Sequence, residues 1–247
     1  MQLNNIDNVI NALGEIVEEC RQENSQLGYF PALYRKTTIQ VKMGLENGRF
    51  DNAGRLEELD IVFARRYIEA YRQHRRGIRP TRAWEYSFQM AQADHPLIMQ
   101  HLLLGMNAHI NLDLGIAAAD VCPGEELIGL RRDFYVISDI LEEMIDWVQA
   151  EINTVSPLLA HVDTVGVRLD EFLCNFGIRK ARLEAWAHAE QLAFVSPAQR
   201  QYVIRQRDKT VSVLARLICP GARWNPVVGR IRAAEVLEPR AVIDVLF

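Results

Sequence analysis

Residues 96–121 read PLIMQHLLLGMNAHINLDLGIAAADV and form the richest apolar stretch of the chain. Polar side chains interrupt it at His101, Asn107, His109, Asn111, Asp113 and Asp120. The stretch is long enough to cross a bilayer, but this many polar groups predict a core helix instead of a membrane span. Because a helix that is apolar on most sides is surrounded by other helices, we expect it to be the buried centre of a bundle.

Apolar residues elsewhere recur every three or four positions, which is typical of amphipathic helices. The expected helices cover about 6–22, 31–47, 51–76, 81–91, 134–148, 156–165, 167–193 and 196–217, with one or two short helices near the end. Thr81 is expected to cap the helix at 81–91. The sequence contains no strand-like alternation, repeat or low-complexity linker. We therefore predict an all-α fold: one domain, residues 1–247, built as a bundle of about eight to ten helices around a central helix at about 96–121.

The composition restricts the classes of partner. The chain has 247 residues, 49% of them hydrophobic, and a formal net charge of -4. A nucleic-acid binder normally carries a basic excess, so we expect no nucleic-acid partner. Cys20, Cys122, Cys174 and Cys219 lie far apart and form no CxxC pair, which predicts free thiols in a reducing cytoplasm. The N-terminus lacks a signal-peptide pattern, so we expect a cytoplasmic protein, and we leave a homodimer open.

A helical wheel divides the polar residues of the central stretch into two stripes. At about 100° per residue, His101, His109 and Asp113 fall within one third of the circumference. Asn107 and Asn111 lie roughly opposite them. Both stripes are expected to face protein or a cavity. The two Asn amides either complete backbone hydrogen bonds of a neighbouring helix or bind substrate.

His109 and Asp113 are the leading candidates for chemistry because an i,i+4 spacing places them about 6 Å apart on one helix face. One hypothesis makes both residues ligands of a divalent metal ion such as Zn, Mn or Fe. The other makes His109 a general base that Asp113 orients. His101 lies about 12 Å away along the axis, so it cannot join the same ion and would complete the catalytic set separately. The alternative to both is a purely structural polar network.

Other helices supply the remaining candidates. Asp60 shares a face with aromatic residues, so we expect it to point inward and to be a third metal ligand, or to pair with an arginine. Arg179 and Trp186 on the later helix, together with Trp84, are expected to bind substrate. Leu183 shares the inward face of that helix, whereas Arg182 only flanks it. The alternative for an arginine there is a stem that lies over an apolar groove with its head in water.

Leu104–Gly115 reads LGMNAHINLDLG, and FPALYR at 30–35, LDIVFA at 59–64 and Trp84 accompany it. On these residues the first half of the chain resembles an uncharacterised bacterial family, a domain of unknown function whose hallmark is LGMNAHINLDLG. The second half matches more loosely, at Ala185–Trp186. The resemblance implies no activity. Nor does the sequence contain a P-loop, a GxGxxG after a strand, an HExxH, a GxSxG or paired ExxH motifs.

The leading hypothesis is a cytoplasmic helical enzyme that acts on a small, partly apolar molecule, in a pocket between the central helix and the helices of Asp60 and Trp186. We expect metal-assisted hydrolysis with His109, Asp113 and Asp60 as ligands. Metal-free acid/base catalysis is the second hypothesis. The third is a binding or scaffold protein whose buried polar stripe only fixes how the helices pack.

Overall fold

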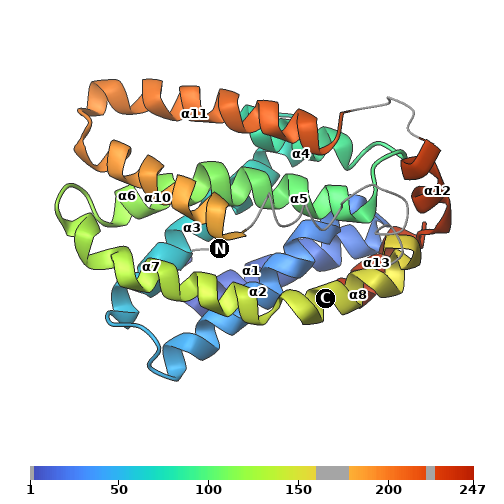
Figure 1. Cartoon of the computed structure of the whole chain (residues 1–247), viewed down its shortest axis with the longest axis horizontal. Coiled ribbons are helices and arrows are strands. Elements are labelled where there is room, and N and C mark those ends of the chain that lie inside the picture. Colours follow the sequence, from blue (N-terminus) through green and yellow to red (C-terminus); the bar gives the residue numbers. More distant parts are fainter. Residues whose placement is uncertain (1–2, 160–177, 221–225) are drawn as a thin grey trace.

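Figure 1 shows the computed structural model of the chain, which describes residues 3–159, 178–220 and 226–247, without the side chains of residues 178 and 179. These ranges contain helices and no strand, so the all-α prediction is confirmed. The elements are α1 (Ile6–Gln22), η1 (Gln26–Gly28), α2 (Tyr29–Glu46), α3 (Ala53–Arg75), α4 (Arg82–Met90), α5 (Ile98–Ala108), η2 (His109–Leu114), α6 (Gly115–Val121), α7 (Glu126–Glu143), α8 (Ile145–Val155), α10 (Ile178–Phe194), α11 (Pro197–Ile218), α12 (Pro226–Ala234) and α13 (Pro239–Leu246).

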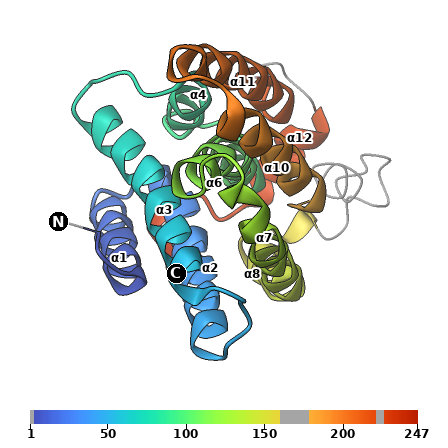
Figure 2. The ribbon, with the colours of Figure 1, turned by 90° about the vertical axis from the view of Figure 1, so that its left-hand side faces the viewer.

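The central helix runs through α5, η2 and α6 without a break, over residues 98–121. Seen end-on in Figure 2, it lies in the middle of the bundle, with α4 and α11 on one side, α10 beside it, and α2, α3 and α7 on the others. Within the described ranges it is the one helix long and apolar enough to cross a membrane, and 94% of its apolar window is buried inside the protein.

Two glycines let neighbouring helices approach the central helix closely. A Cβ atom at Gly105 would lie 2.4 Å from the Phe30 ring of α2. One at Gly115 would lie 2.6 Å from the backbone oxygen of Ala185 on α10. Both distances are far below van der Waals contact, so only glycine permits these crossings.

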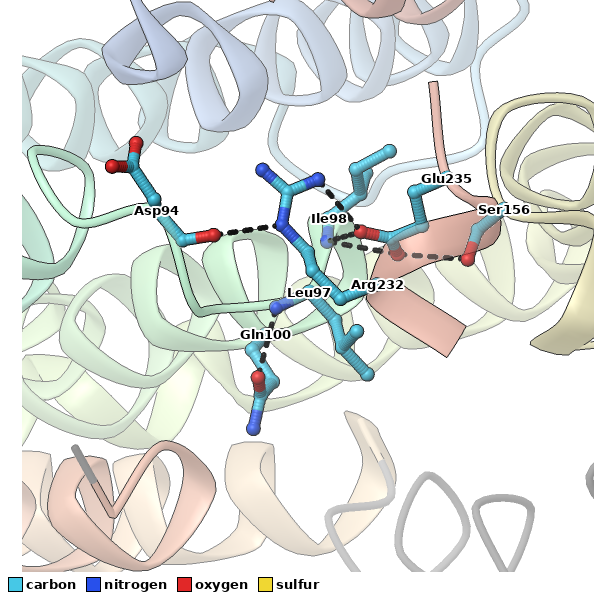
Figure 3. Close-up of polar contacts among 7 residues, drawn as sticks. All are labelled: Asp94, Leu97, Ile98, Gln100, Ser156, Arg232 and Glu235. Atoms are coloured by element: carbon cyan, nitrogen blue, oxygen red, sulfur yellow. Dashed lines mark hydrogen bonds and ion pairs between the residues drawn. The ribbon is translucent and has the colours of Figure 1, made fainter. Parts of the chain in front are cut away.

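The N-terminus of the central helix is capped by a residue that lies far away in the sequence. Both carboxylate oxygens of Glu235 accept from the Ile98 backbone N–H, at 3.1 and 3.2 Å. Ser156 Oγ donates to the same carboxylate at 2.8 Å, and an Arg232 nitrogen lies 3.3 Å from it (Figure 3). Burial raises the pKa of Glu235, and these donors oppose the rise. Each oxygen has partners, so this cluster fixes the start of the helix.

Helix α4 is also capped from across the bundle. Thr81 occupies the expected N-cap position, but its side chain makes no capping hydrogen bond. The Asp208 carboxylate of α11 takes that role, because it accepts from the backbone N–H groups of Arg82 and Ala83 at 2.9 and 3.0 Å. The predicted position was therefore right and the predicted capping group was wrong.

The other expected helices differ in their limits. The single helix expected at 134–148 belongs to two helices, α7 and α8, which meet at Met144. In place of a helix at 156–165, the structure describes one 3-10 turn at 157–159. The rest of that segment and the start of the helix expected at 167 lie outside the described residues.

Residues His109–Leu114 form a π-helix inside the central helix. In a π-helix the backbone hydrogen bond runs between residues i and i+5, so one turn takes more residues than in an α-helix. The wheel drawn at 100° per residue is therefore wrong over this segment. Short π-helical turns inside α-helices are frequent at functional sites.

Candidate functional site

A cavity of about 510 Å³ lies on one side of the central helix. It is bounded by α2, α3, α5, η2, α7, α8 and one residue of α10. The lining residues are Phe30, Leu33, Tyr34, Thr37, Thr38, Val41, Leu59, Asp60, Phe63, Met99, Leu102, Leu103, Met106, His109, Ile110, Leu114, Ile137, Leu141, Glu142, Met144, Ile145, Val148, Gln149, Ile152 and Arg182. Most of them are apolar, and the volume suits a drug-sized molecule, since small-molecule pockets measure about 300–1,000 Å³.

His109 lies at the aromatic end of this cavity. Its ring stacks on Phe63, with centroids 3.5 Å apart and an interplanar angle of 7°, and Tyr34 meets it edge-on at 4.3 Å. Neither ring nitrogen has a hydrogen-bond partner among the described residues. Burial, and then the charge of Arg66, lower the pKa of His109 well below its usual value of 6.5. The imidazole is therefore neutral, with one donor and one acceptor nitrogen free.

Asp60 enters the same cavity from α3, as its place on an apolar face predicted. Its Oδ2 atom is buried and has no hydrogen-bond partner in the described part of the chain. Burial, and then the nearby Glu57 carboxylate, raise the pKa of Asp60 from 3.8 to about 7. The expected ion pair with an arginine does not form within the described ranges. Asp60 is therefore a carboxyl group that can give or take a proton near neutral pH.

Asp113 bonds Arg66 and Trp84 instead of His109, so the expected His109–Asp113 hydrogen bond does not form. Its Oδ1 accepts from Arg66 Nε at 2.7 Å, and its Oδ2 accepts from Trp84 Nε1 at 2.7 Å. Burial raises the pKa of Asp113, and Arg66 and Trp84 oppose the rise. The physical reason for the difference is that Arg66 and Trp84, on other helices, bond the two carboxylate oxygens. Asp113 joins α3 and α4 to the central helix.

Asn107 and Asn111 face α11 and do not line the cavity. Asn107 Nδ2 donates to the Val211 backbone oxygen at 3.0 Å, and Asn111 Nδ2 donates to Asn107 Oδ1 at 3.0 Å. Arg207 Nε of α11 donates to the Asn111 backbone oxygen at 2.7 Å. These contacts correspond to the structural alternative, in which the amides bond a neighbouring helix.

The other predicted site residues also lie away from the cavity. His101 packs edge-on against Tyr29 at 5.5 Å, and burial, followed by the charges of Arg232 and His95, lowers its pKa to about 3. Trp84 holds Asp113, as described above.

The later helix also differs from the prediction. Trp186 Nε1 donates to Glu190 at 2.7 Å, and its ring packs on Phe134 at 5.0 Å, so it does not reach the cavity. The side chain of Arg179 lies outside the described residues. Leu183, which was expected to face inward, is 51% exposed. Arg182 takes the inward position instead.

Arg182 is the cavity residue that sequence reasoning placed only on a flank. It is 2% exposed, it donates from one terminal nitrogen to the Phe134 backbone oxygen, and its guanidinium lies 4.5 Å above the Phe134 ring. Its Nε has no hydrogen-bond partner, and it makes no ion pair within the described ranges. Burial lowers its pKa from 12.5, but a guanidinium stays charged in proteins. The only signal in the sequence was an arginine next to an inward-facing stripe.

The residues predicted as metal ligands are not brought together. His109 and Asp60 share the cavity, whereas Asp113 is bonded elsewhere. Across the described ranges, no group of three or more His, Cys, Asp or Glu side chains has the arrangement that a metal ion requires. What the cavity does combine is a carboxyl group, a neutral imidazole and a buried guanidinium within apolar walls.

The fold and the site define an all-α bundle with a mostly apolar internal cavity that contains free polar atoms. Residues 6–220 match the family of unknown function DUF5995, and the chain belongs to that family. No curated protein sequence and no solved structure matches the chain.

Proposed function

We propose that this protein is an acid/base enzyme that acts on a small, mostly apolar molecule inside the cavity. One observation carries the proposal: free polar atoms of Asp60, His109 and Arg182 lie in a cavity of about 510 Å³ with apolar walls. Buried polar groups are nearly always hydrogen-bonded, because leaving one unpaired costs about 1–3 kcal/mol. Three such groups around one cavity are therefore best explained by a ligand that completes their bonds.

The side chains that line the cavity indicate that the ligand is mostly apolar. Met99, Met106 and Met144 line the cavity together with leucine and isoleucine side chains. Methionine is flexible and polarisable, so it fits apolar molecules of more than one shape. Most of the binding energy would come from the removal of apolar surface from water, both on the cavity walls and on the ligand.

Asp60 would transfer the proton, and His109 would hold the substrate by a hydrogen bond. The pKa of Asp60, about 7, allows the carboxyl group to be either acid or base at neutral pH. His109 stays neutral because its pKa is lowered, so it would donate one hydrogen bond to a polar atom of the substrate or accept one from it. The stack on Phe63 and the edge contact with Tyr34 fix the plane of the imidazole ring.

Conversion of a defined mixture of small aliphatic acids, esters, ketones and alcohols, followed by mass spectrometry, tests the proposal. The wild-type chain is expected to bind and convert at least one class. Asp60→Asn keeps the shape of the side chain, so it should bind the same compounds but convert them about 100-fold more slowly or worse. Asp146→Asn, at an exposed position on α8, is the matched control and should behave as wild type.

Three results would change the proposal. If no compound binds, or if Asp60→Asn converts substrate at the wild-type rate, the acid/base proposal fails. If compounds bind and none is converted, a carrier or binding protein replaces the enzyme. If conversion appears only after Zn, Mn or Fe is added, metal-assisted hydrolysis becomes the better account, with further ligands recruited beside His109 and Asp60.

The cytoplasm remains our proposed location. Cys20 and Cys122 are buried free thiols, and Cys174 lies outside the described residues. Free thiols are the common state of cysteine in a reducing compartment. A small-molecule substrate is the partner we propose. A homodimer, no nucleic-acid partner and no membrane span stay predictions from the sequence.

A further inference from the structure

We infer that the ligand of this cavity carries one carboxylate group, which binds Arg182, on an aliphatic body that fills the apolar space. The inference rests on the proposed function, because it names the class of molecule for the same site. It starts from Arg182 alone and does not depend on which residue transfers the proton.

Arg182 forms no ion pair with an acidic side chain of the described ranges, and the nearby Asp139 carboxylate only partly opposes the lowering of its pKa by burial. It is 2% exposed, and no acidic side chain of the described ranges lies within ion-pair distance. Its protein contacts are the Phe134 backbone oxygen and the Phe134 ring, which leave Nε free. A buried charge is stable only when it is paired, so an anion from outside is the expected partner.

Three other arginines near the core are different. Arg66 reaches the buried Asp113 carboxylate at 2.7 Å, and Arg200 and Arg207 reach Asp120 and Glu184. Each of these residues has its counter-ion within the protein. The contrast indicates that the place opposite Arg182 is kept for a ligand.

A carboxylate fits this place better than other head groups. One guanidinium balances one negative charge, whereas a phosphate would bring more charge than the apolar walls can compensate. A cationic head group would meet the positive charge of Arg182. The Phe63 ring near Asp60 cannot bind such a cation through its face either, because His109 already covers that face, with centroids 3.5 Å apart. Asp60, with a pKa of about 7, is largely protonated below neutral pH and does not repel an acid there.

Calorimetric titration of the full chain at pH 6 with octanoate, octan-1-ol and octylamine tests this inference, because the three probes share one aliphatic chain. Octanoate is expected to bind about tenfold or more tightly than octan-1-ol, and octylamine to bind most weakly, since charge-assisted bonds are about twice as strong as neutral ones. Arg182→Met should remove the preference for octanoate and leave the affinity for octan-1-ol unchanged. Arg182→Lys should keep part of the preference.

Arg216→Met is the matched control, because the exposed Arg216 also lies over an aromatic ring, 5.0 Å from the Tyr86 centroid, but away from the cavity. It should keep the full preference. Equal binding of all three probes, tighter binding of octylamine, or a preference that survives in Arg182→Met would overturn the inference while the proposed function stands. Failure of all three probes to bind the wild-type chain would count against the proposed function itself. The preference is measured first on the unmodified chain, so a variant that fails to fold leaves no result undecided.

Discussion

The two sides of the central helix treat buried polar groups in opposite ways. On the side of α11, Asn107 and Asn111 bond each other and the α11 backbone, and Arg207 bonds the Asn111 carbonyl. On the cavity side, polar atoms of His109 and Asp60 have no partner in the described part of the chain. The residues of the two sides are close in sequence, so the difference lies in what faces them.

The comparison teaches how to separate structural from functional polar groups in a core. Most groups that build the fold have their hydrogen bonds completed by the protein, because an unpaired buried group costs stability; His101, buried without a partner outside the cavity, is an exception. Groups that bind a ligand have polar atoms without a hydrogen-bond partner in the protein, and they lower its stability accordingly. The variants below test this division, from the largest expected effect to the smallest.

Asp113→Ala should be the most destabilising change. It would leave Trp84 Nε1 unpaired in the core and Arg66 without its counter-ion. We expect the free energy of unfolding, measured by urea denaturation, to fall by about 3 kcal/mol. Asp120→Ala is the control, since it breaks a more exposed pair with Arg200 on the same helix and should cost less than about 1 kcal/mol. Equal effects at both positions would contradict the structural role of Asp113.

Asp60→Asn should stabilise the protein at alkaline pH. Because the pKa of Asp60 is raised to about 7 in the folded state, the folded chain binds the proton more tightly than the unfolded chain does. The contribution of Asp60 to the free energy of unfolding of the wild-type chain is therefore present at pH 4 and is lost as the pH rises to about 7.

The variant and wild type should thus be equally stable near pH 4, and the variant should be more stable by about 2 kcal/mol at pH 8, with allowance for water in the cavity. Denaturation across this pH range measures the difference. The buried neutral histidines affect both proteins alike and cancel. A difference that does not change with pH would contradict the raised pKa.

Asn107→Leu should cost a smaller amount, about 1 kcal/mol, because it removes the bond to the Val211 carbonyl and leaves the Asn111 amide without its acceptor. The branched shape of the side chain is kept, although leucine is larger, so the loss combines the hydrogen bonds with some overpacking. Urea denaturation would show it. An unchanged or higher stability would remove the distinction between the two sides of the helix.

His109→Phe should have the smallest effect on stability, within about 0.5 kcal/mol, because no hydrogen bond of the protein is lost and the aromatic packing is kept. His101→Phe, at a second buried histidine without partners but outside the cavity, is the control. Only the variant at 109 should change conversion of the substrate. A large loss of stability at 109 would place it among the structural groups.

Much of the fold could be predicted from the sequence. The spacing of apolar residues predicted α1 at 6–22, and the all-round apolar character of 96–121 predicted its central place. Asp60 was expected to face inward because it shares a face with aromatic residues, and it lines the cavity. These features depend on local periodicity, which the sequence displays directly.

Two parts of the site could not be predicted, and each has a physical reason. The partners of Asp113 come from α3 and α4, which lie far away in the sequence and which a wheel of one helix cannot show, so Asp113 was paired with the wrong partner. The orientation of α10 depends on its contacts with the central helix and α7, so Arg182 was placed on a flank while Leu183 was placed inside. Small rotations of one helix exchange neighbouring residues between the core and the surface.

The titration of the Asp60 carboxyl group by carbon-13 NMR tests the central claim most directly, with the signal assigned by its absence in Asp60→Asn. Our account predicts a midpoint at about pH 7, since Asp60 lies in an apolar cavity without a cation beside it. A midpoint near the ordinary value of 3.8 would mean that the carboxylate is well solvated or paired, and the proposed proton donor would be lost.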